Sequence, residues 1–279
     1  MDDKTGQEKV LRVDIRKVFR EKNPTIARII PGFVYRYIER IVHQDFINDF
    51  LERHGHKTGV DFIHAAFEEF NNEFIIRGFD NIPDSGRFIF ASNHPLGGFD
   101  GIILIEMVSR KYPKVKFLVN DILMNVGPLA EHFVAINKHG GQAREVIKEL
   151  DQIYKSDTQV LTFPAGIVSR RIKGVIQDLP WQKSFIQKAV QYKRDIIPVH
   201  FSGRNSNWFY NLANFRKFFG IKWNLEMFYL VDETVKHRNK TIHITIGKPI
   251  PYQHFDNSKT PMQWADELRS LVYSLPSTN

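Results

Sequence analysis

The segment Ala91–Gly101 holds the residues whose types and spacing best suit chemistry. It reads Ala-Ser-Asn-His-Pro-Leu-Gly-Gly-Phe-Asp-Gly, so that His94 and Asp100 bracket the pair Gly97-Gly98. A histidine whose second ring nitrogen bonds a carboxylate can act as a general base, because the carboxylate fixes the tautomer and stabilises the imidazolium. Two glycines would let the chain turn tightly enough to bring these side chains together. The alternative is structural: the histidine caps a loop and the aspartate caps the next helix.

The composition limits which other chemistry is available. The 279-residue chain has no cysteine, which excludes disulfides, thiolate zinc sites, iron–sulfur clusters and a cysteine nucleophile. Nucleophilic or acid–base chemistry must then come from His, Ser, Lys or carboxylates. The net charge of +8 favours an anionic partner, such as an acidic membrane or an acidic carrier protein. The positive residues are dispersed and no nucleic-acid-binding motif accompanies them, so we expect no nucleic-acid partner.

Apolar runs and helical patterns alternate after Arg77, whereas the chain up to about Phe74 reads as helical. Phe88–Ser92 predicts a buried strand, and Lys240–Gly247 alternates with the period of two that is typical of a half-buried strand. Further strands are predicted at 116–119, 133–136, 159–163 and 196–201, and helices at 101–110, 143–154, 185–192 and 261–275. This order predicts an α/β fold in which a largely parallel sheet is flanked by helices. Functional residues of such sheets gather where strands end, which is where His94 lies.

Residues 1–72 read as an N-terminal helical region, and residues 73–279 as the α/β domain. Apolar residues recur at helical spacing from Ile26 to Val42 and on to Leu51, opposite a basic face, and Pro31 predicts a kink. Such a helix either packs on the core or lies in a bilayer interface as a membrane-docking element. No run of about 20 apolar residues could span a membrane, and the start of the chain has no signal-peptide hydrophobic region. We therefore expect a cytoplasmic protein, soluble or bound to a membrane surface.

Three further segments extend the pattern that Asn93-His94 and Asp100 begin. They are Pro128 to Lys138, Phe163-Pro164-Ala165-Gly166, and Ile197-Pro198-Val199 followed by Gly203. With these four blocks in order, the sequence resembles the glycerolipid acyltransferase family, of the lysophosphatidic-acid acyltransferase type. The resemblance covers roughly Asn72 to Pro251.

The blocks depart from the family pattern in several places. The family has four residues between its His and Asp, whereas this chain has five, and an extra residue beside two glycines can be absorbed as a bulge. The family's glutamate and arginine in the third block are Ala165 and Val168 here, and the Asp-Arg ending of its second block is Asn137-Lys138. Those family positions are associated with gripping the acceptor's phosphate, and valine cannot replace an arginine fork. The differences imply either lost activity or an acceptor other than lysophosphatidic acid.

Three segments favour the second explanation. They are Ser169-Arg170-Arg171, Asp178-Leu-Pro-Trp181 and Gly203-Arg204-Asn205-Ser206, which resemble a bacterial subgroup of O-acyltransferases for lyso-ornithine and other amino-acid lipids, the glycine lipids among them. Some members of this subgroup carry a haemolysin-like label. The resemblance implies transfer of an acyl group from acyl-carrier protein or coenzyme A to the hydroxyl of a lyso-lipid, with no bound cofactor and no metal. It also implies a membrane-lipid acceptor, a peripheral position on the cytoplasmic face and docking by the helix at 26–42.

The family's roles can be placed on this chain by its motifs. His94 is implied as general base and Asp100 as the residue that orients it, with backbone amides near Gly97-Gly98 or Gly166 as donors to an oxyanion. The residues expected to contact substrate are Asn93, Gly97, Gly98, Lys138, Phe163, Pro164, Gly166, Ser169, Arg170, Arg171 and Arg204. For each cation the alternative is a solvated surface charge. Two other functions stay open: a lysophosphatidic-acid or lysophospholipid acyltransferase of phospholipid synthesis, and a lipid-binding protein without turnover.

Overall fold

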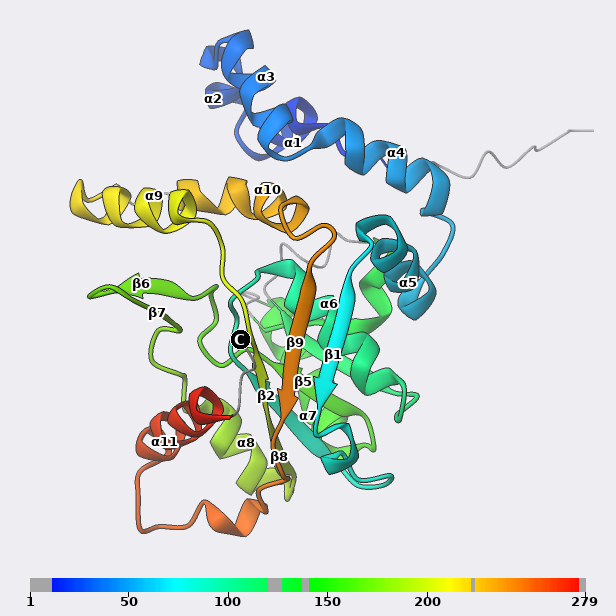
Figure 1. Ribbon diagram of the computed structural model, residues 1–279, viewed down its shortest axis with the longest axis vertical. Coiled ribbons are helices and arrows are strands. Elements are labelled where there is room, and N and C mark those ends of the chain that lie inside the picture. The colour runs from blue at the N-terminus through cyan, green and yellow to red at the C-terminus, as the bar shows by residue number, and fades with distance from the viewer. Residues whose placement is uncertain (1–11, 120–126, 137–140, 222–223, 276–279) are drawn as a thin grey trace, which may run out of the picture.

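The computed structural model describes residues 12–119, 127–136, 141–221 and 224–275 (Figure 1). Among these residues, seven strands form one sheet in the order β1-β9-β8-β2-β5-β3-β4. All neighbours are parallel except β8 and β9, so the predicted α/β fold with a largely parallel sheet is confirmed. The strands are β1 (Glu73–Arg77), β2 (Phe88–Ser92), β3 (Val115–Val119), β4 (Phe133–Ala135), β5 (Gln159–Thr162), β8 (Asp195–Phe201) and β9 (Thr241–Ile246).

The register of the central strands determines which loops meet. Ala91 of β2 pairs with Thr162 of β5 on one side and with Pro198 of β8 on the other. Because these three strands are parallel, their carboxyl ends lie at the same edge of the sheet. The loops that follow β2, β5 and β8 therefore start side by side.

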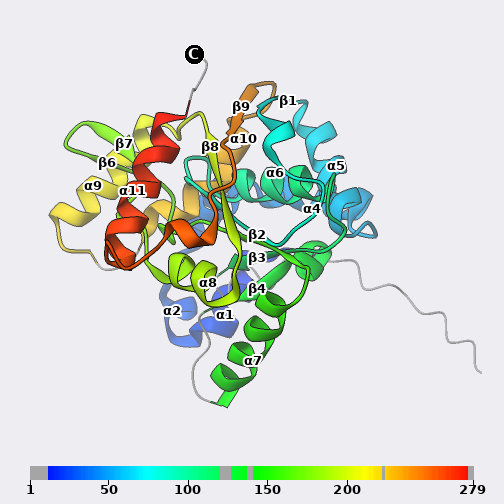
Figure 2. The ribbon, with the colours of Figure 1, turned by 90° about the horizontal axis from the view of Figure 1, so that it is seen from below.

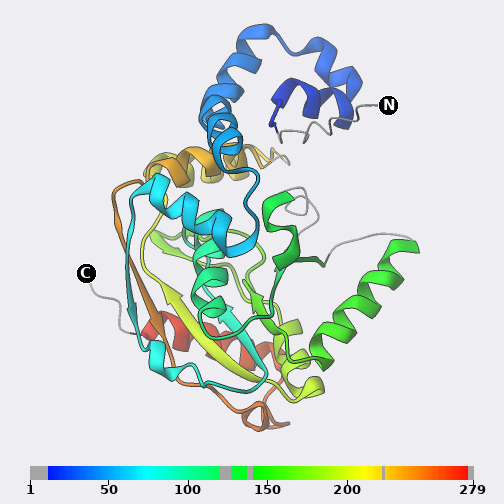
Figure 3. The same cartoon turned by 90° about the vertical axis from the view of Figure 1, so that its right-hand side faces the viewer.

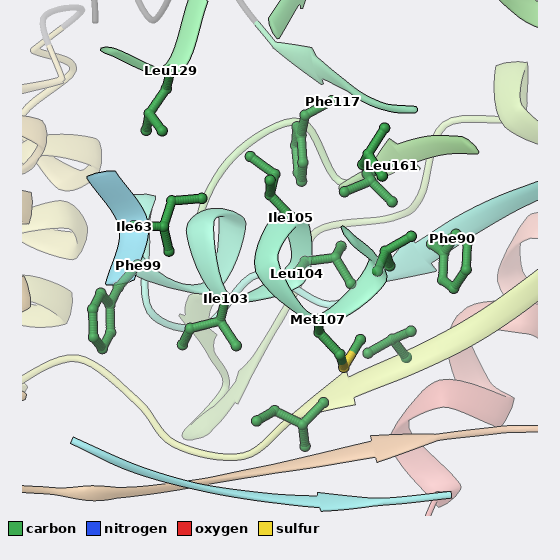
Figure 4. Packing of buried hydrophobic residues seen from close by; sticks show 14 of the residues in the cluster. Ile63, Phe90, Phe99, Ile103, Leu104, Ile105, Met107, Phe117, Leu129 and Leu161 are labelled. Atoms are coloured by element: carbon green, nitrogen blue, oxygen red, sulfur yellow. The ribbon is translucent and has the colours of Figure 1, made fainter. Parts of the chain in front are cut away.

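The two faces of β2 belong to different apolar layers. Phe88 and Phe90 lie in one core cluster, whereas Ile89 and Ala91 lie in the other, as the period of two in a strand requires. Helices cover both sides of the sheet (Figures 2 and 3). The first layer contains α4 (Gln44–His54), α5 (Gly59–Phe70) and α6 (Gly98–Ser109), and the second contains α7 (Gly141–Lys155), α8 (Ser184–Tyr192) and α11 (Pro261–Ser274). Figure 4 shows α6 surrounded by the first cluster, which fixes the helix that follows the His94 turn.

The first three helices lie above one end of the sheet (Figure 1) and are called here the N-terminal cap. They are α1 (Ile15–Lys22), α2 (Pro24–Ile29) and α3 (Gly32–Ile41). The prediction of one kinked helix over 26–42 is wrong, because a break at Ile30-Pro31 separates α2 from α3. Proline lacks an N–H and disfavours helical backbone in the residue before it. The helical period also breaks at His43, whose φ of 50° ends the run before α4 begins.

The cap rests on a segment made of η4 (Leu225–Tyr229) and α10 (Leu230–Val235). His43 Nε2 lies 2.9 Å from Asp232 Oδ1, and the hydroxyls of Tyr37 and Tyr229 are hydrogen-bonded. In contrast, α4 and α5 contribute side chains to the same core cluster as the sheet. The division into two domains at residues 72 and 73, which falls between α5 and β1, stays a prediction.

Several elements lack a counterpart in the prediction. They are β1, the hairpin of β6 (Arg170–Ile172) and β7 (Val175–Gln177), the helix α9 (Asn207–Phe218), η4, α10, and the short 3-10 helices η1 (Phe79–Asn81), η3 (Gly127–His132) and η5 (Tyr252–His254). Strands of three residues are too short to show a periodic signal. Within the described parts of the chain, no helix has both the length and the apolar character that crossing a membrane requires.

Candidate active site

His94 and Asp100 meet at the turn between β2 and α6. His94 Nδ1 lies 2.9 Å from Asp100 Oδ1, and Asp100 Oδ2 accepts the backbone N–H of Leu96 at 2.9 Å. Gly97 precedes α6 with a φ of 75°. Glycine adopts this conformation readily, whereas residues with a Cβ disfavour it. The turn thus accommodates five residues between the histidine and the aspartate while keeping their side chains in contact.

Burial controls the charge of this pair. The Asp100 side chain is completely buried and that of His94 is 15% exposed. Burial raises the pKa of Asp100, while the charge and hydrogen bond of His94 and the N–H of Leu96 act to lower it. The carboxylate form therefore depends on these two neighbours. Since Nδ1 faces Asp100, the ring presents Nε2, which has no hydrogen-bond partner among the described residues.

Phe163, directly after β5, stacks on the imidazole of His94. Their ring centroids are 3.9 Å apart and their planes differ by 17°. Phe117 of β3 packs against Phe163 at 4.9 Å, and a Cβ placed on Gly101 of α6 would lie 3.8 Å from the Phe163 ring. Packing from three elements fixes the plane of the imidazole, as a preorganised site requires.

Asp178 holds the His94 turn in place, although the sequence analysis did not identify it as a site residue. Its fully buried carboxylate accepts the N–H of His94 at 3.2 Å, the Ser169 hydroxyl at 2.6 Å and Trp181 Nε1 at 2.9 Å. The Ser169 N–H in turn donates to the His94 carbonyl at 2.8 Å. Asp178 therefore joins the loop after β2 to the loop after β5. The available signal was an acidic residue within the segment Asp178-Leu-Pro-Trp181.

Asn93 connects the ends of β2 and β8. Its Nδ2 donates to the carbonyl of Phe201 at 2.9 Å, and its Oδ1 accepts the N–H of Phe201 at 2.7 Å. Only 2% of the residue is exposed. Both polar atoms of this expected substrate contact therefore bond to the backbone of the neighbouring strand, where they position the turn.

Gly98 and Gly166 border open space. Both are exposed, and a Cβ placed on either would meet no atom within 4 Å. Gly98 is the first residue of α6, and the N–H groups of a first helical turn have no partner within the helix. Such groups are suited to stabilising an oxyanion. Gly166 follows the buried Pro164, whose carbonyl accepts the N–H of Gln182 at 2.9 Å.

Arg170 lies in a buried ion pair. It donates to Glu226 at 3.2 Å and to the Val168 carbonyl at 2.7 Å, and the fully buried Glu226 also pairs with Arg216 at 2.8 Å. Burial lowers the pKa of Arg170, and the charge of Glu226 acts in the opposite direction. The guanidinium thus joins β6 to η4 and α9 inside the protein.

The other three cations have different surroundings. Arg171 is half-buried and donates to the side-chain oxygens of Asn207 and Asn211 at 2.5 and 3.0 Å. Arg204 is exposed and lines a pocket beyond the end of β8. Lys138 lies outside the described residues. Contact between these cations and a substrate stays a prediction.

The third block is apolar and buried where it departs from the family pattern. Val168 is 1% exposed and packs with Phe209 and Tyr210 of α9, while Ala165 lies in the second core cluster. Trp181 is fully buried in that second cluster as well. The side chains at 165 and 168 therefore contribute to packing in this chain.

The chain is similar to several known acyltransferases. A model described as acyltransferase matches residues 17–275. A lyso-glycine lipid O-acyltransferase of Bacteroides thetaiotaomicron is 51% identical over 264 residues, which cover 94% of this chain and 97% of that protein. Another from Phocaeicola vulgatus is 45% identical over 273 residues, or 98% of each chain. The 1-acyl-sn-glycerophosphate acyltransferase PlsC of Thermotoga maritima has a TM-score of 0.49 and 16% identity, over 76% of this chain and 75% of its own. Because the family match spans nearly the whole chain, this protein belongs to the acyltransferase family.

Proposed function

We propose that this acyltransferase moves a fatty acyl group from a thioester to the hydroxyl of a lyso-glycine lipid. Support for this acceptor comes from the two relatives named for that activity, each aligned over nearly its full length. The buried Val168 fits the same acceptor, because a glycine lipid offers no phosphate for an arginine at that position. The observation that carries the chemistry is the contact between His94 and Asp100, which leaves Nε2 without a protein partner among the described residues.

His94 acts as the general base in this proposal. Its Nε2 accepts the acceptor's hydroxyl proton as the hydroxyl oxygen attacks the thioester carbonyl carbon, and Asp100 stabilises the imidazolium from 2.9 Å. When the tetrahedral intermediate collapses, the C–S bond breaks and the imidazolium returns the proton to the leaving thiolate. The products are an ester and a free thiol, and His94 is neutral again. A positioned general base contributes roughly 10²–10⁴-fold to the rate.

Two further parts of the proposal concern the oxyanion and the donor. The N–H groups of the first turn of α6, beginning at Gly98, stabilise the oxyanion of the intermediate. The donor is acyl-carrier protein or coenzyme A, since either presents anionic groups to a chain with a net charge of +8. Neither the donor nor the acceptor requires a bound cofactor for this reaction.

The N-terminal cap is the proposed docking element for the cytoplasmic face of a membrane. Ile29 of α2 is 74% exposed, and Phe33 and Tyr37, one turn apart on α3, are 66% and 41% exposed. Exposed Arg36 and Arg40 lie on the same helix as Phe33 and Tyr37. Exposed aromatic and aliphatic side chains beside arginines suit an interface that contains anionic lipid.

The catalytic proposal is tested with purified full-length protein and both thioester carriers. The acceptors are lyso-glycine lipid, lyso-ornithine lipid and lysophosphatidic acid, and the wild type is compared with His94→Ala. His56→Ala is the matched control, because His56 is exposed and lies in the loop between α4 and α5. We expect turnover of lyso-glycine lipid that His94→Ala abolishes and His56→Ala retains.

Other outcomes distinguish the alternatives. Turnover of lysophosphatidic acid alone would support the acyltransferase activity and contradict lyso-glycine lipid as the acceptor. Retained turnover in His94→Ala would overturn the general base. A folded wild type that binds acyl chains but transfers none with either carrier would favour the lipid-binding alternative.

The docking proposal is tested by sedimentation with vesicles of phosphatidylglycerol and phosphatidylcholine. The double variant Ile29→Asp with Phe33→Asp places charge on the exposed apolar face of the cap. The control is Ile147→Asp with Val175→Asp, since these residues of α7 and β7 are 65% and 57% exposed. We expect the first pair to lose sedimentation and the control to keep it, and equal sedimentation of both would contradict docking by the cap.

A further inference from the structure

A pocket of about 270 Å³, lined by polar and charged residues, lies outside the contacts that hold His94. One wall is the segment 204–206, which follows β8, and the other is the segment 233–240, which runs from α10 to the start of β9. Neither wall contributes to the β2 turn or to the loop after β5. The pocket is therefore not explained by the chemistry described above.

Cations without ion-pair partners line this pocket. The side chains of Arg204 and Lys240 are exposed, and within the described residues neither forms a salt bridge or a hydrogen bond. Lys236 pairs with Asp232 at 2.7 Å and with Glu233 at 2.9 Å. Because Glu233 is already compensated by Lys236, the pocket presents two positive charges that are available to an anion.

Two residues that line the pocket also have buried polar atoms without partners among the described residues. Asn205 is only 2% exposed, and neither its Nδ2 nor its Oδ1 has a hydrogen-bond partner among the described residues. His237 is 6% exposed and its Nε2 is likewise unpartnered. A buried amide normally finds a donor and an acceptor, so a small turn of the Asn205 side chain toward the pocket would let a ligand supply both.

Both walls begin beside the turn that carries His94. A Cβ placed on Gly203 would lie 3.0 Å from Leu96 Cδ2, and one placed on Gly97 would lie 3.1 Å from Leu230 Cδ2. Gly203 immediately precedes one wall, and Leu230 opens the helix that leads to the other. The pocket is therefore built on neighbours of the catalytic turn, which suits it to the far end of a molecule whose hydroxyl reaches His94.

We propose that this pocket binds the headgroup of the acceptor, recognised as a carboxylate beside an amide N–H. Arg204 and Lys240 pair with the carboxylate, Asn205 Nδ2 donates to it, and Asn205 Oδ1 accepts the amide N–H. The proposal rests on the proposed function, because an N-acylated glycine offers these two groups side by side. A phosphate of the thioester donor is the other anion that this reaction could bring to the pocket.

The experiment compares Arg204→Ala and Lys240→Ala with Lys248→Ala in the full chain. Lys248 is a matched control, because it is exposed and follows the other end of β9. Two acceptors are used: lyso-glycine lipid and its carboxamide analogue, in which the carboxylate is replaced by an uncharged amide. Binding of N-octanoylglycine and N-octanoylglycinamide is measured by calorimetry on the same proteins, so that one readout does not require turnover.

We expect each pocket variant to raise KM for lyso-glycine lipid by about tenfold, the usual consequence of losing a charge-assisted hydrogen bond. In these variants we expect no change in kcat, in KM for the thioester or in KM for the carboxamide. Lys248→Ala has the kinetics of the wild type. Arg204→Lys has a smaller rise in KM than Arg204→Ala. N-octanoylglycine binding weakens in the same two variants.

Three results would overturn the proposal. An equal rise in KM for lyso-glycine lipid and for its carboxamide analogue would show that the two cations do not recognise the negative charge. A rise in the thioester KM alone would assign the pocket to a donor phosphate. Unchanged kinetics on lyso-glycine lipid would remove the pocket from recognition while leaving the proposed function intact. Conversely, charge-dependent binding of N-octanoylglycine with no turnover of lyso-glycine lipid would keep the pocket and overturn the proposed function.

Discussion

The His94 turn and the N-terminal cap are held in place by different means. At the turn, Asp100 and Asp178 are completely buried and each carboxylate accepts more than one hydrogen bond. The cap is held by the hydrogen bond of Tyr37 with Tyr229 and, just after α3, by the partly exposed pair of His43 with Asp232, whose side chains are 28% and 25% exposed. Buried hydrogen bonds to charged groups stabilise more than exposed ion pairs do. The contrast indicates a fixed reaction centre beneath a cap that can open locally without disturbing it.

The largest expected effect comes from a variant that removes the charge of Asp100 and keeps the size of its side chain. In Asp100→Asn the amide no longer stabilises an imidazolium, so kcat falls by about 10²–10⁴-fold. Steady-state kinetics measure this, and circular dichroism verifies the fold. Asp61→Asn, at an exposed position of α5, is the control and keeps the wild-type kcat. A kcat that survives in Asp100→Asn would contradict the role of the buried carboxylate.

The second prediction concerns Glu226, which joins the hairpin of β6 and β7 to α9. Glu226→Ala leaves Arg170 and Arg216 without their buried partner and lowers the free energy of unfolding by about 3–5 kcal/mol. Urea denaturation measures this. The control Glu52→Ala removes a 67%-exposed carboxylate and changes stability by less than about 1 kcal/mol. If Glu226→Ala were to keep its stability and lose acceptor affinity instead, Arg170 would belong to the substrate site.

Acid provides a third test, at a histidine that lies just after the segment on which the cap rests. Burial lowers the pKa of His237 to about 4 from its ordinary 6.5, so the unfolded chain binds more protons between these values. The free energy of unfolding therefore falls as the pH drops from 6.5 to 4, by at most about 1.4 kcal/mol per pH unit. His237→Gln removes this contribution and His56→Gln does not. Parallel pH profiles of wild type and His237→Gln, from urea titrations, would contradict it.

The smallest expected effect lies at the contact between cap and domain. His43→Ala removes the pair with Asp232 and costs about 0.2–1 kcal/mol. Amide hydrogen exchange in α3 speeds up while exchange in α6 stays unchanged. Faster exchange in α6 as well would show that the cap and the reaction centre open together, and would remove the contrast between them.

The sequence predicts the strands and helices best where one residue type dominates a face. Residues 88–91 are all apolar because the strand is buried on both sides, and Phe88–Ser92 is confirmed as a strand whose five residues are all buried. The cap is predicted less well, because a periodic apolar pattern does not reveal that Pro31 separates two helices rather than bending one. An apolar periodic pattern shows which side of a segment is buried, whereas the position of a helix break depends on the backbone preferences of proline.

The candidate site is predictable where partners are close in sequence. His94 and Asp100 lie within one turn, so the spacing of two glycines points to their contact. Asp178 is 84 residues from His94, and Arg170 is 56 residues from Glu226, which forms an ion pair with it. Only the folded sheet brings such partners together, and a charged residue on its own reads as surface.

The pairing of β1 with β9 has a consequence for how the protein is made. Glu73 pairs with Thr241 and Arg77 with Thr245, so an early strand of the chain completes the sheet with one of the last. During synthesis, β1 and the edge of β8 wait without partners until Ile246 has left the ribosome. Such unpaired edges promote aggregation and slow folding. We therefore expect chains that terminate before β9 to fold poorly, to bind chaperones and to be degraded by proteases.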